Sequence, residues 1–104
     1  MIRQFDIVEN PSARSRGVAP YVMLVQSHLY DEGLTALVAP LLAMPEAATV
    51  TRVSLPVNFN GEAYLLMLSE LGAVERRVVT RTLGSLADRE DDIRRALDRL
   101  FTGF

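Results

Sequence analysis

The chain has 104 residues, 49% of them hydrophobic and 23% charged, which is typical of one globular domain. Eleven arginines, no lysine and thirteen acidic residues give a net charge of −2, which argues against nonspecific neutralisation of nucleic-acid phosphates. Cysteine is absent, which excludes disulfides, thiolate metal sites and a catalytic cysteine. The sequence offers neither a signal-peptide core nor the run of about 20 apolar residues that spans a bilayer, so we expect a cytoplasmic protein without membrane contact.

The N-terminal half predicts three strands. Apolar and polar residues alternate over residues 4–8, which predicts the first strand. Residues 21–25 are consecutively apolar and β-favouring, which predicts a strand covered on both faces. Residues 35–42 predict a third strand, bent or interrupted at Pro40.

Residues 51–68 predict a β-hairpin. Val53, Leu55, Val57 and Phe59 alternate with more polar residues. Asn60-Gly61 follows, a pair that tolerates the positive φ angles of a type I′ turn. Pro56 has no N–H group, so its strand should lie at an edge or a bulge. The β-branched residues near 77–83 predict one further strand.

The C-terminal segment predicts an amphipathic helix. Ser85 is the expected N-cap, with Asp88 three residues later. Acidic residues precede arginines, as the helix dipole favours, and the spacing predicts the pairs Glu90–Arg94 and Asp91–Arg95. One apolar stripe is predicted, made of Ile93, Ala96, Leu97, Leu100, Phe101 and Phe104. The terminal Phe104 is open to two interpretations, a protein-binding tip or a ring folded onto the core.

Catalytic and metal-binding patterns are weak. Ser27, His28 and Asp31 are the elements of a triad, but sequence neighbours rarely converge on one reaction centre. With no cysteine and a single histidine, a metal site is not expected. The acids at 90–92 are explained by the helix N-terminus. We therefore expect no cofactor, no metal and no catalytic residue.

Four segments in register resemble the CcdB toxins. Val25-Gln26-Ser27-His28-Leu29-Tyr30-Asp31 resembles their Val-Gln-Ser-Asp-hydrophobic-hydrophobic-Asp segment, and Val38-Ala39-Pro40-Leu41 is similar to the Val-Ile-Pro-Leu strand that follows it. The hairpin from Leu55-Pro56-Val57 to Met67, and residues 89–104, match in order and nearly without gaps. The likeness spans almost the whole chain.

This resemblance implies a single domain over residues 1–104 with a mostly β fold. The expected architecture is an SH3-like antiparallel barrel of about five strands, of the CcdB and MazF type, with a small additional sheet and one C-terminal helix. It also implies a homodimeric toxin of a type II toxin–antitoxin pair. Such a toxin binds the A subunit of DNA gyrase, traps the cleaved gyrase–DNA complex, and is not an enzyme. Its cognate antitoxin neutralises it, and the pair represses its own operon, so the toxin alone should not bind DNA.

Family gyrase contacts can be carried over by position. They fall on Ser27, Leu29, Tyr30, Glu90, Asp91, Arg95, Thr102, Gly103 and Phe104. The chain departs from the best-known pattern at three of these, with Thr102 for tryptophan, Phe104 for isoleucine and Arg95 for asparagine.

Charge complementarity adds Arg14, Arg16, Arg76 and Arg77 as candidate contacts for an acidic antitoxin tail. Two alternatives remain open. One is a MazF-like endoribonuclease that uses Arg16, Arg81 or His28, and the other is an inactive or retargeted relative.

Overall fold

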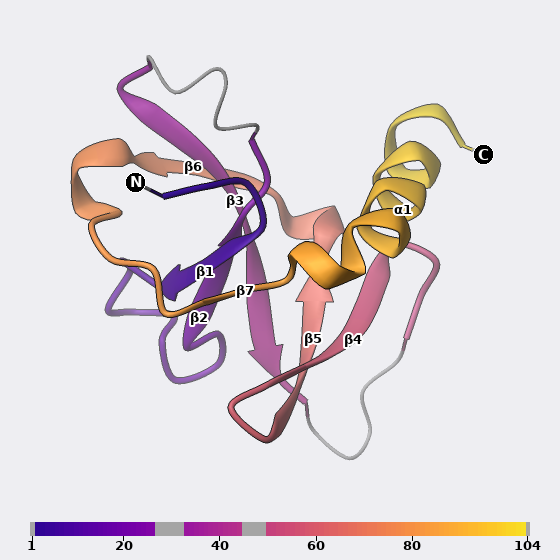
Figure 1. Cartoon of the computed structure of the whole chain (residues 1–104), viewed down its shortest axis with the longest axis horizontal. Helices are drawn as coiled ribbons and strands as arrows, with labels where there is room; N and C mark the ends of the chain where they lie inside the picture. Colours follow the sequence, from indigo (N-terminus) through magenta and orange to yellow (C-terminus); the bar gives the residue numbers. More distant parts are fainter. Residues whose placement is uncertain (1, 27–32, 45–49, 104) are drawn as a thin grey trace.

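The computed structural model describes residues 2–26, 33–44 and 50–103, and it has the predicted mostly β architecture with one C-terminal helix (Figure 1). The strands are β1 (Asp6–Glu9), β2 (Tyr21–Leu24), β3 (Thr35–Ala43), β4 (Ser54–Phe59), β5 (Glu62–Met67), β6 (Gly72–Glu75) and β7 (Gly84–Ser85). The helix is α1 (Glu90–Thr102), and the 3₁₀ turns are η2 (Leu68–Glu70), η3 (Arg76–Val78) and η4 (Ala87–Arg89).

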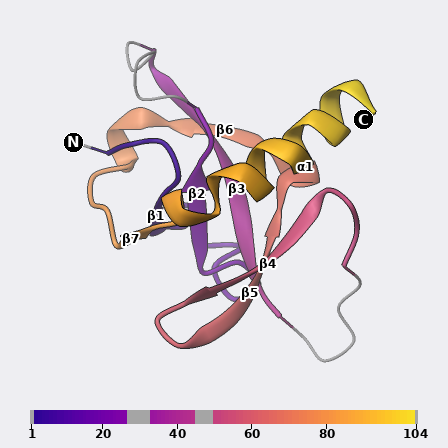
Figure 2. The same cartoon turned by 45° about the vertical axis from the view of Figure 1, so that its right-hand side comes forward.

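The strands form one antiparallel sheet that curls into a half-barrel. Its order is β4-β5-β3-β2-β1-β7, and β6 also pairs with β3. The first part of β3 pairs with β6 and its last residues pair with β5, while η2 links these two neighbours. The β4–β5 hairpin projects from this curl but stays hydrogen-bonded to it through β5 (Figure 2). The predicted fold class is confirmed.

Strand β2 is covered on both faces, as its apolar run predicts. Met23 and Val25 face the larger core, which α1 closes with the buried side chains of Ile93 and Ala96. The alternate residues of β2 face a second apolar cluster, made of Val8, Val22, Leu24, Ala36 and Val38. Because each fully buried aliphatic side chain contributes about 1.5–3 kcal/mol, the two clusters fix β2 at the centre of the domain.

The predicted hairpin turn is confirmed. Asn60 and Gly61 both have positive φ, 52° and 77°, as a type I′ turn requires. Strand β4 lies at the end of the sheet, so the missing N–H of Pro56 leaves no ladder hydrogen bond unmade. Beside the turn, the Tyr21 ring meets Phe59 and Tyr64 edge-on, with centroids 5.1 and 5.6 Å apart.

The strand predicted near residues 77–83 is wrong. Residues 76–78 form the 3₁₀ turn η3, and residues 79–83 have no strand partner in the described chain. The strands of this region instead are β6 and β7, which pair with β3 and β1. Which residues form strands here depends on pairing with β1 and β3, which are distant in the sequence. The β-propensity of residues 77–83 carries no information about such pairing.

The predicted capping of the helix by Ser85 is also wrong. Helix α1 begins at Glu90, with Arg89 at the N-cap and no side-chain cap hydrogen bond. The turn η4 precedes it, and the Ser85 hydroxyl accepts the N–H of Ala87 at 3.1 Å. The Ser85 hydroxyl therefore binds the first residue of the turn that precedes the α-helix, not the start of the α-helix itself.

Candidate functional site

Helix α1 carries most of the described residues that the resemblance assigns to target binding. Asp91, Arg95 and Thr102 are exposed and, together with Asp98, recur at helical spacing on the side opposite the buried Ile93. We call these four residues the outer strip. The helix has 13 residues, so at about 1.5 Å per residue the strip runs nearly its whole length. It is an exposed polar surface suited to protein contact.

Ion pairs hold the start of this helix. Glu90 pairs with Arg94 at 2.8 Å, as predicted. The predicted partner of Arg95 is wrong, because Arg95 binds Asp92 at 2.6 Å rather than Asp91. Arg89 contacts the other oxygen of Asp92 at 3.2 Å. Hydrogen bonds from Arg95 and then Arg89 lower the pKa of the Asp92 carboxyl below its usual 3.8.

At the other end of α1, glycine terminates the helix. Gly103 has a φ of 80°, and its N–H donates to the Arg99 carbonyl at 3.0 Å, as in a left-handed C-cap. The Thr102 hydroxyl donates to the Asp98 carbonyl at 2.6 Å. Gly103 therefore has a conformational role in addition to any contact with a partner.

The predicted target contacts are only partly placed. Within the described chain, α1 unites Glu90, Asp91, Arg95, Thr102 and Gly103 along one element. The predicted contacts Ser27, Leu29, Tyr30 and Phe104 lie outside the described residues, as do His28 and Asp31 of the rejected triad.

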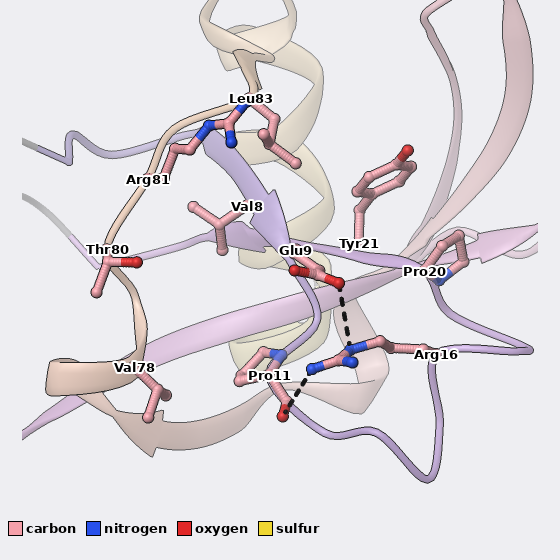
Figure 3. Close-up of a pocket in the computed structure, with 10 residues that line it drawn as sticks. All are labelled: Val8, Glu9, Pro11, Arg16, Pro20, Tyr21, Val78, Thr80, Arg81 and Leu83. Carbon is pink, nitrogen blue, oxygen red and sulfur yellow. Dashed lines mark hydrogen bonds and ion pairs between the residues drawn. The ribbon is translucent and has the colours of Figure 1, made fainter.

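A second candidate site is a pocket of about 760 Å³ beside the end of β1 (Figure 3). Val8 and Glu9 lie between the loop that carries Arg16 and the segment that carries Arg81. Arg16 Nε lies 3.6 Å from the Glu9 carboxylate and donates to the Asn10 carbonyl at 2.6 Å. Arg81 is exposed. Two cations and one carboxylate leave this pocket with a surplus positive charge.

Of the four arginines predicted to bind an antitoxin, only Arg16 lines this pocket. Arg14 is exposed in the loop between β1 and β2. Arg76 donates to the carbonyls of Gly33 and Thr35, at 3.0 and 3.2 Å, and Arg77 pairs with Glu75. The structure therefore does not gather the four into one patch.

Neither a metal centre nor a membrane span is found in the part of the chain that the structure describes. No group of three or more His, Cys, Asp or Glu side chains there is arranged to hold a metal ion. No helix in those residues is both long enough and apolar enough to cross a bilayer.

Comparison with known proteins decides the family. The family model of the CcdB protein matches residues 4–103. The chain belongs to the CcdB family. This match supports the predicted class of toxin–antitoxin toxin. No curated protein matches the chain.

The fold of this CcdB-family protein also occurs in a solved toxin structure. Mycobacterium tuberculosis toxin MazF-mt6 matches with a TM-score of 0.69, over 95% of this chain and 96% of that chain. The two sequences are 16% identical, so the likeness shows a shared fold and carries no information about the site.

Sequence reasoning did not predict the Arg16–Arg81 pocket. The sequence offers Arg16 and Arg81 only as separate candidates for an RNA-cutting site, and Arg81 lies in the wrongly predicted strand 77–83. The approach of this segment to β1 depends on the two-residue pairing of β7, which leaves no periodic signal in the sequence.

Proposed function

We propose that this CcdB-family protein is the toxin of a type II toxin–antitoxin pair and that it binds the A subunit of DNA gyrase. It traps the cleaved gyrase–DNA complex. The observation that carries the proposal is the outer strip of α1, an exposed polar surface that leads to the C-terminal Thr102-Gly103-Phe104. The family match over residues 4–103 supports it.

The contact surface combines the outer strip with the other positions carried over from the family. Asp91 and Arg95 offer opposite charges one helical turn apart, so they recognise a partner with complementary charges. Asp92 holds Arg95 in place at 2.6 Å, which reduces the side-chain entropy lost on binding. Arg95 stands where the family pattern has asparagine, and it gives this protein a longer reach and a positive charge.

A supercoiled plasmid incubated with gyrase and the purified protein tests this proposal. Linear DNA should accumulate after detergent and protease treatment, and Asp91→Ala should reduce its yield. Asp88→Ala is the matched control, because Asp88 is an exposed aspartate of η4 outside the outer strip. No linear DNA from the unaltered protein, or equal loss in both variants, would contradict gyrase poisoning.

We also propose a homodimer, because Phe101 on α1 is left 69% exposed in the single chain. Pairing across a two-fold axis, the commonest geometry for identical subunits, would cover this ring. Light scattering at micromolar concentration should give twice the chain mass of 11.5 kDa. A mass of one chain across that range would contradict the dimer.

The alternative function, an RNA-cutting toxin, is favoured only by the fold shared with MazF-mt6. Cleavage of RNA needs a general base and stabilisation of the charged phosphate. In the pocket beside β1, Glu9 is the one carboxylate among the described lining residues, and it faces Arg16 at 3.6 Å. The family match over residues 4–103 favours an inhibitor over an enzyme, so incubation with total RNA should leave the RNA intact.

Repression of the operon is assigned to the antitoxin complex. With a net charge of −2, the isolated protein has little general attraction for DNA, and an electrophoretic shift assay at physiological salt should show no binding.

A further inference from the structure

The outer edge of β1 is only partly paired. Asn10 N–H donates to the Pro20 carbonyl at 3.0 Å, and β1 pairs with β2 in the register Glu9↔Tyr21. Because hydrogen-bonded pairs alternate in an antiparallel ladder, the main-chain groups of Val8 face β2 and those of Glu9 face the opposite edge. On that edge the ladder with β7 ends at Ile7↔Gly84. Among the described residues, no strand lies opposite Glu9.

A second unpaired stretch of backbone lies across from Glu9. The Val79 N–H donates to the Arg76 carbonyl, and the Leu83 N–H donates to the Ile7 carbonyl at 2.8 Å. Between these two anchors, the N–H groups of residues 80–82 donate no main-chain hydrogen bond within the described structure. This stretch therefore presents main-chain groups that a ligand can use.

The pocket of about 760 Å³ separates these two backbones (Figure 3). Its lining includes the apolar side chains of Val8, Val78 and Leu83, and the cations of Arg16 and Arg81. Side chains of an extended peptide point alternately to opposite faces, so a peptide that alternates apolar and acidic residues offers partners for both kinds of lining group.

We propose that an extended acidic peptide binds in this pocket as an added strand between β1 and residues 80–82. When a peptide adds as a strand, its main-chain hydrogen bonds supply affinity. The pocket that receives every second side chain of the peptide supplies specificity. The proposal goes beyond the proposed function, because none of the described lining residues of this pocket belongs to helix α1. An RNA ligand is disfavoured, because the Glu9 carboxylate opposes a phosphate backbone and because RNA lacks the amide groups that pair with a strand edge.

The test uses the full chain and an acetylated, amidated hexapeptide in which glutamate alternates with leucine, titrated while the amide resonances of the protein are recorded. Saturable shifts should concentrate at residues 8, 9 and 80–82. The same peptide with N-methylated alternate amides should bind at least about ten-fold more weakly, because it cannot donate to the strand edge. This arm leaves the protein unchanged, so it does not depend on any variant folding.

Charge is tested by Arg81→Gln, which should weaken peptide binding about five-fold or more. Arg52→Gln removes the same charge from an exposed position outside the pocket and should leave binding unchanged. Equal affinity for both peptides, shifts located elsewhere, or tighter binding of an RNA hexanucleotide would overturn the proposal. The Arg81→Gln variant should still poison gyrase. Loss of peptide binding can therefore be distinguished from loss of gyrase poisoning.

Discussion

Gly84 of β7 lies directly beneath the ring of Phe59, so that a Cβ atom added at Gly84 would stand 2.5 Å from Phe59 Cε1. The contact joins the strand that precedes α1 to the tip of the β4–β5 hairpin. The ring also packs edge-on against Tyr21 at a centroid distance of 5.1 Å, so it has little freedom to move away. A side chain at position 84 would therefore displace the Phe59 ring.

Gly84→Ala should lower the free energy of unfolding by about 1–3 kcal/mol, the usual cost of inserting a methyl group into a packed site. Gly72→Ala is the matched control, because Gly72 is also in a strand but has no atom within 4 Å of its added Cβ. Urea unfolding of both variants measures the difference. An equal loss in the two variants would show that the Phe59 contact is not the cause.

Local chemistry explains which parts of the fold were predictable. The turn at Asn60-Gly61 and the doubly covered β2 follow from residues adjacent in sequence, and both predictions are confirmed. The strand predicted at 77–83 is wrong because strand formation there depends on β1 and β3, which lie far away in sequence. The β-branched side chains favour an extended backbone but cannot supply a partner strand.

Of the two candidate sites, only the outer strip of α1 was predictable from local sequence. The outer strip is a helical pattern, so helical spacing alone aligns Asp91, Arg95 and Thr102. The Arg16–Arg81 pocket depends on a loop and an unpaired segment that only the folded chain brings together. The sequence names Arg16 and Arg81 only as alternatives for an RNA-cutting site and gives no sign that the fold places both in one pocket.

Tyr64 should make the protein less stable in alkali. Burial, followed by the hydrogen bond to Glu62, raises the pKa of the Tyr64 phenol above 10.0. The unfolded chain then loses this proton first, so stability is full below about pH 10 and declines as the pH rises towards the folded pKa. Tyr64→Phe should flatten this decline in urea midpoints measured between pH 9 and 11. Glu62→Gln should give an intermediate slope, since burial of the phenol remains, and a slope unchanged in Tyr64→Phe would refute the assignment.

Asp92 should make the stability of the protein depend on pH in the acidic range. Its pKa is lowered by Arg95 and Arg89, so its contribution to stability is present above the unfolded value of 3.8 and is lost as the pH falls through the folded pKa. Asp92→Asn should be less stable than the unaltered protein at pH 7 and should lose less stability between pH 5 and 2. Asp91→Asn leaves the network of Asp92 with both arginines intact and should keep the original acid profile. Thermal melting across this range distinguishes the two variants.

The final prediction concerns the C-terminal tip. Deletion of Gly103 and Phe104 should abolish growth inhibition while changing the melting temperature little. The one described hydrogen bond that is lost runs from Gly103 N–H to the Arg99 carbonyl at the exposed end of α1. An aromatic anchor at an interface, by contrast, contributes about 2 kcal/mol or more to binding. Phe104→Ala is the companion variant, because it removes the ring and keeps the glycine cap.

Two further outcomes separate the possible roles of this tip. Gly103→Ala should cost about 1–2 kcal/mol of stability through its left-handed φ of 80°, even though its Cβ meets no atom within 4 Å. If Phe104 instead packs on the core, Phe104→Ala should lower stability by about 3 kcal/mol or more. A truncated protein that stays folded and still arrests growth would contradict the gyrase-binding tip. RNA integrity in the arrested cells would then decide whether the toxin acts as a nuclease.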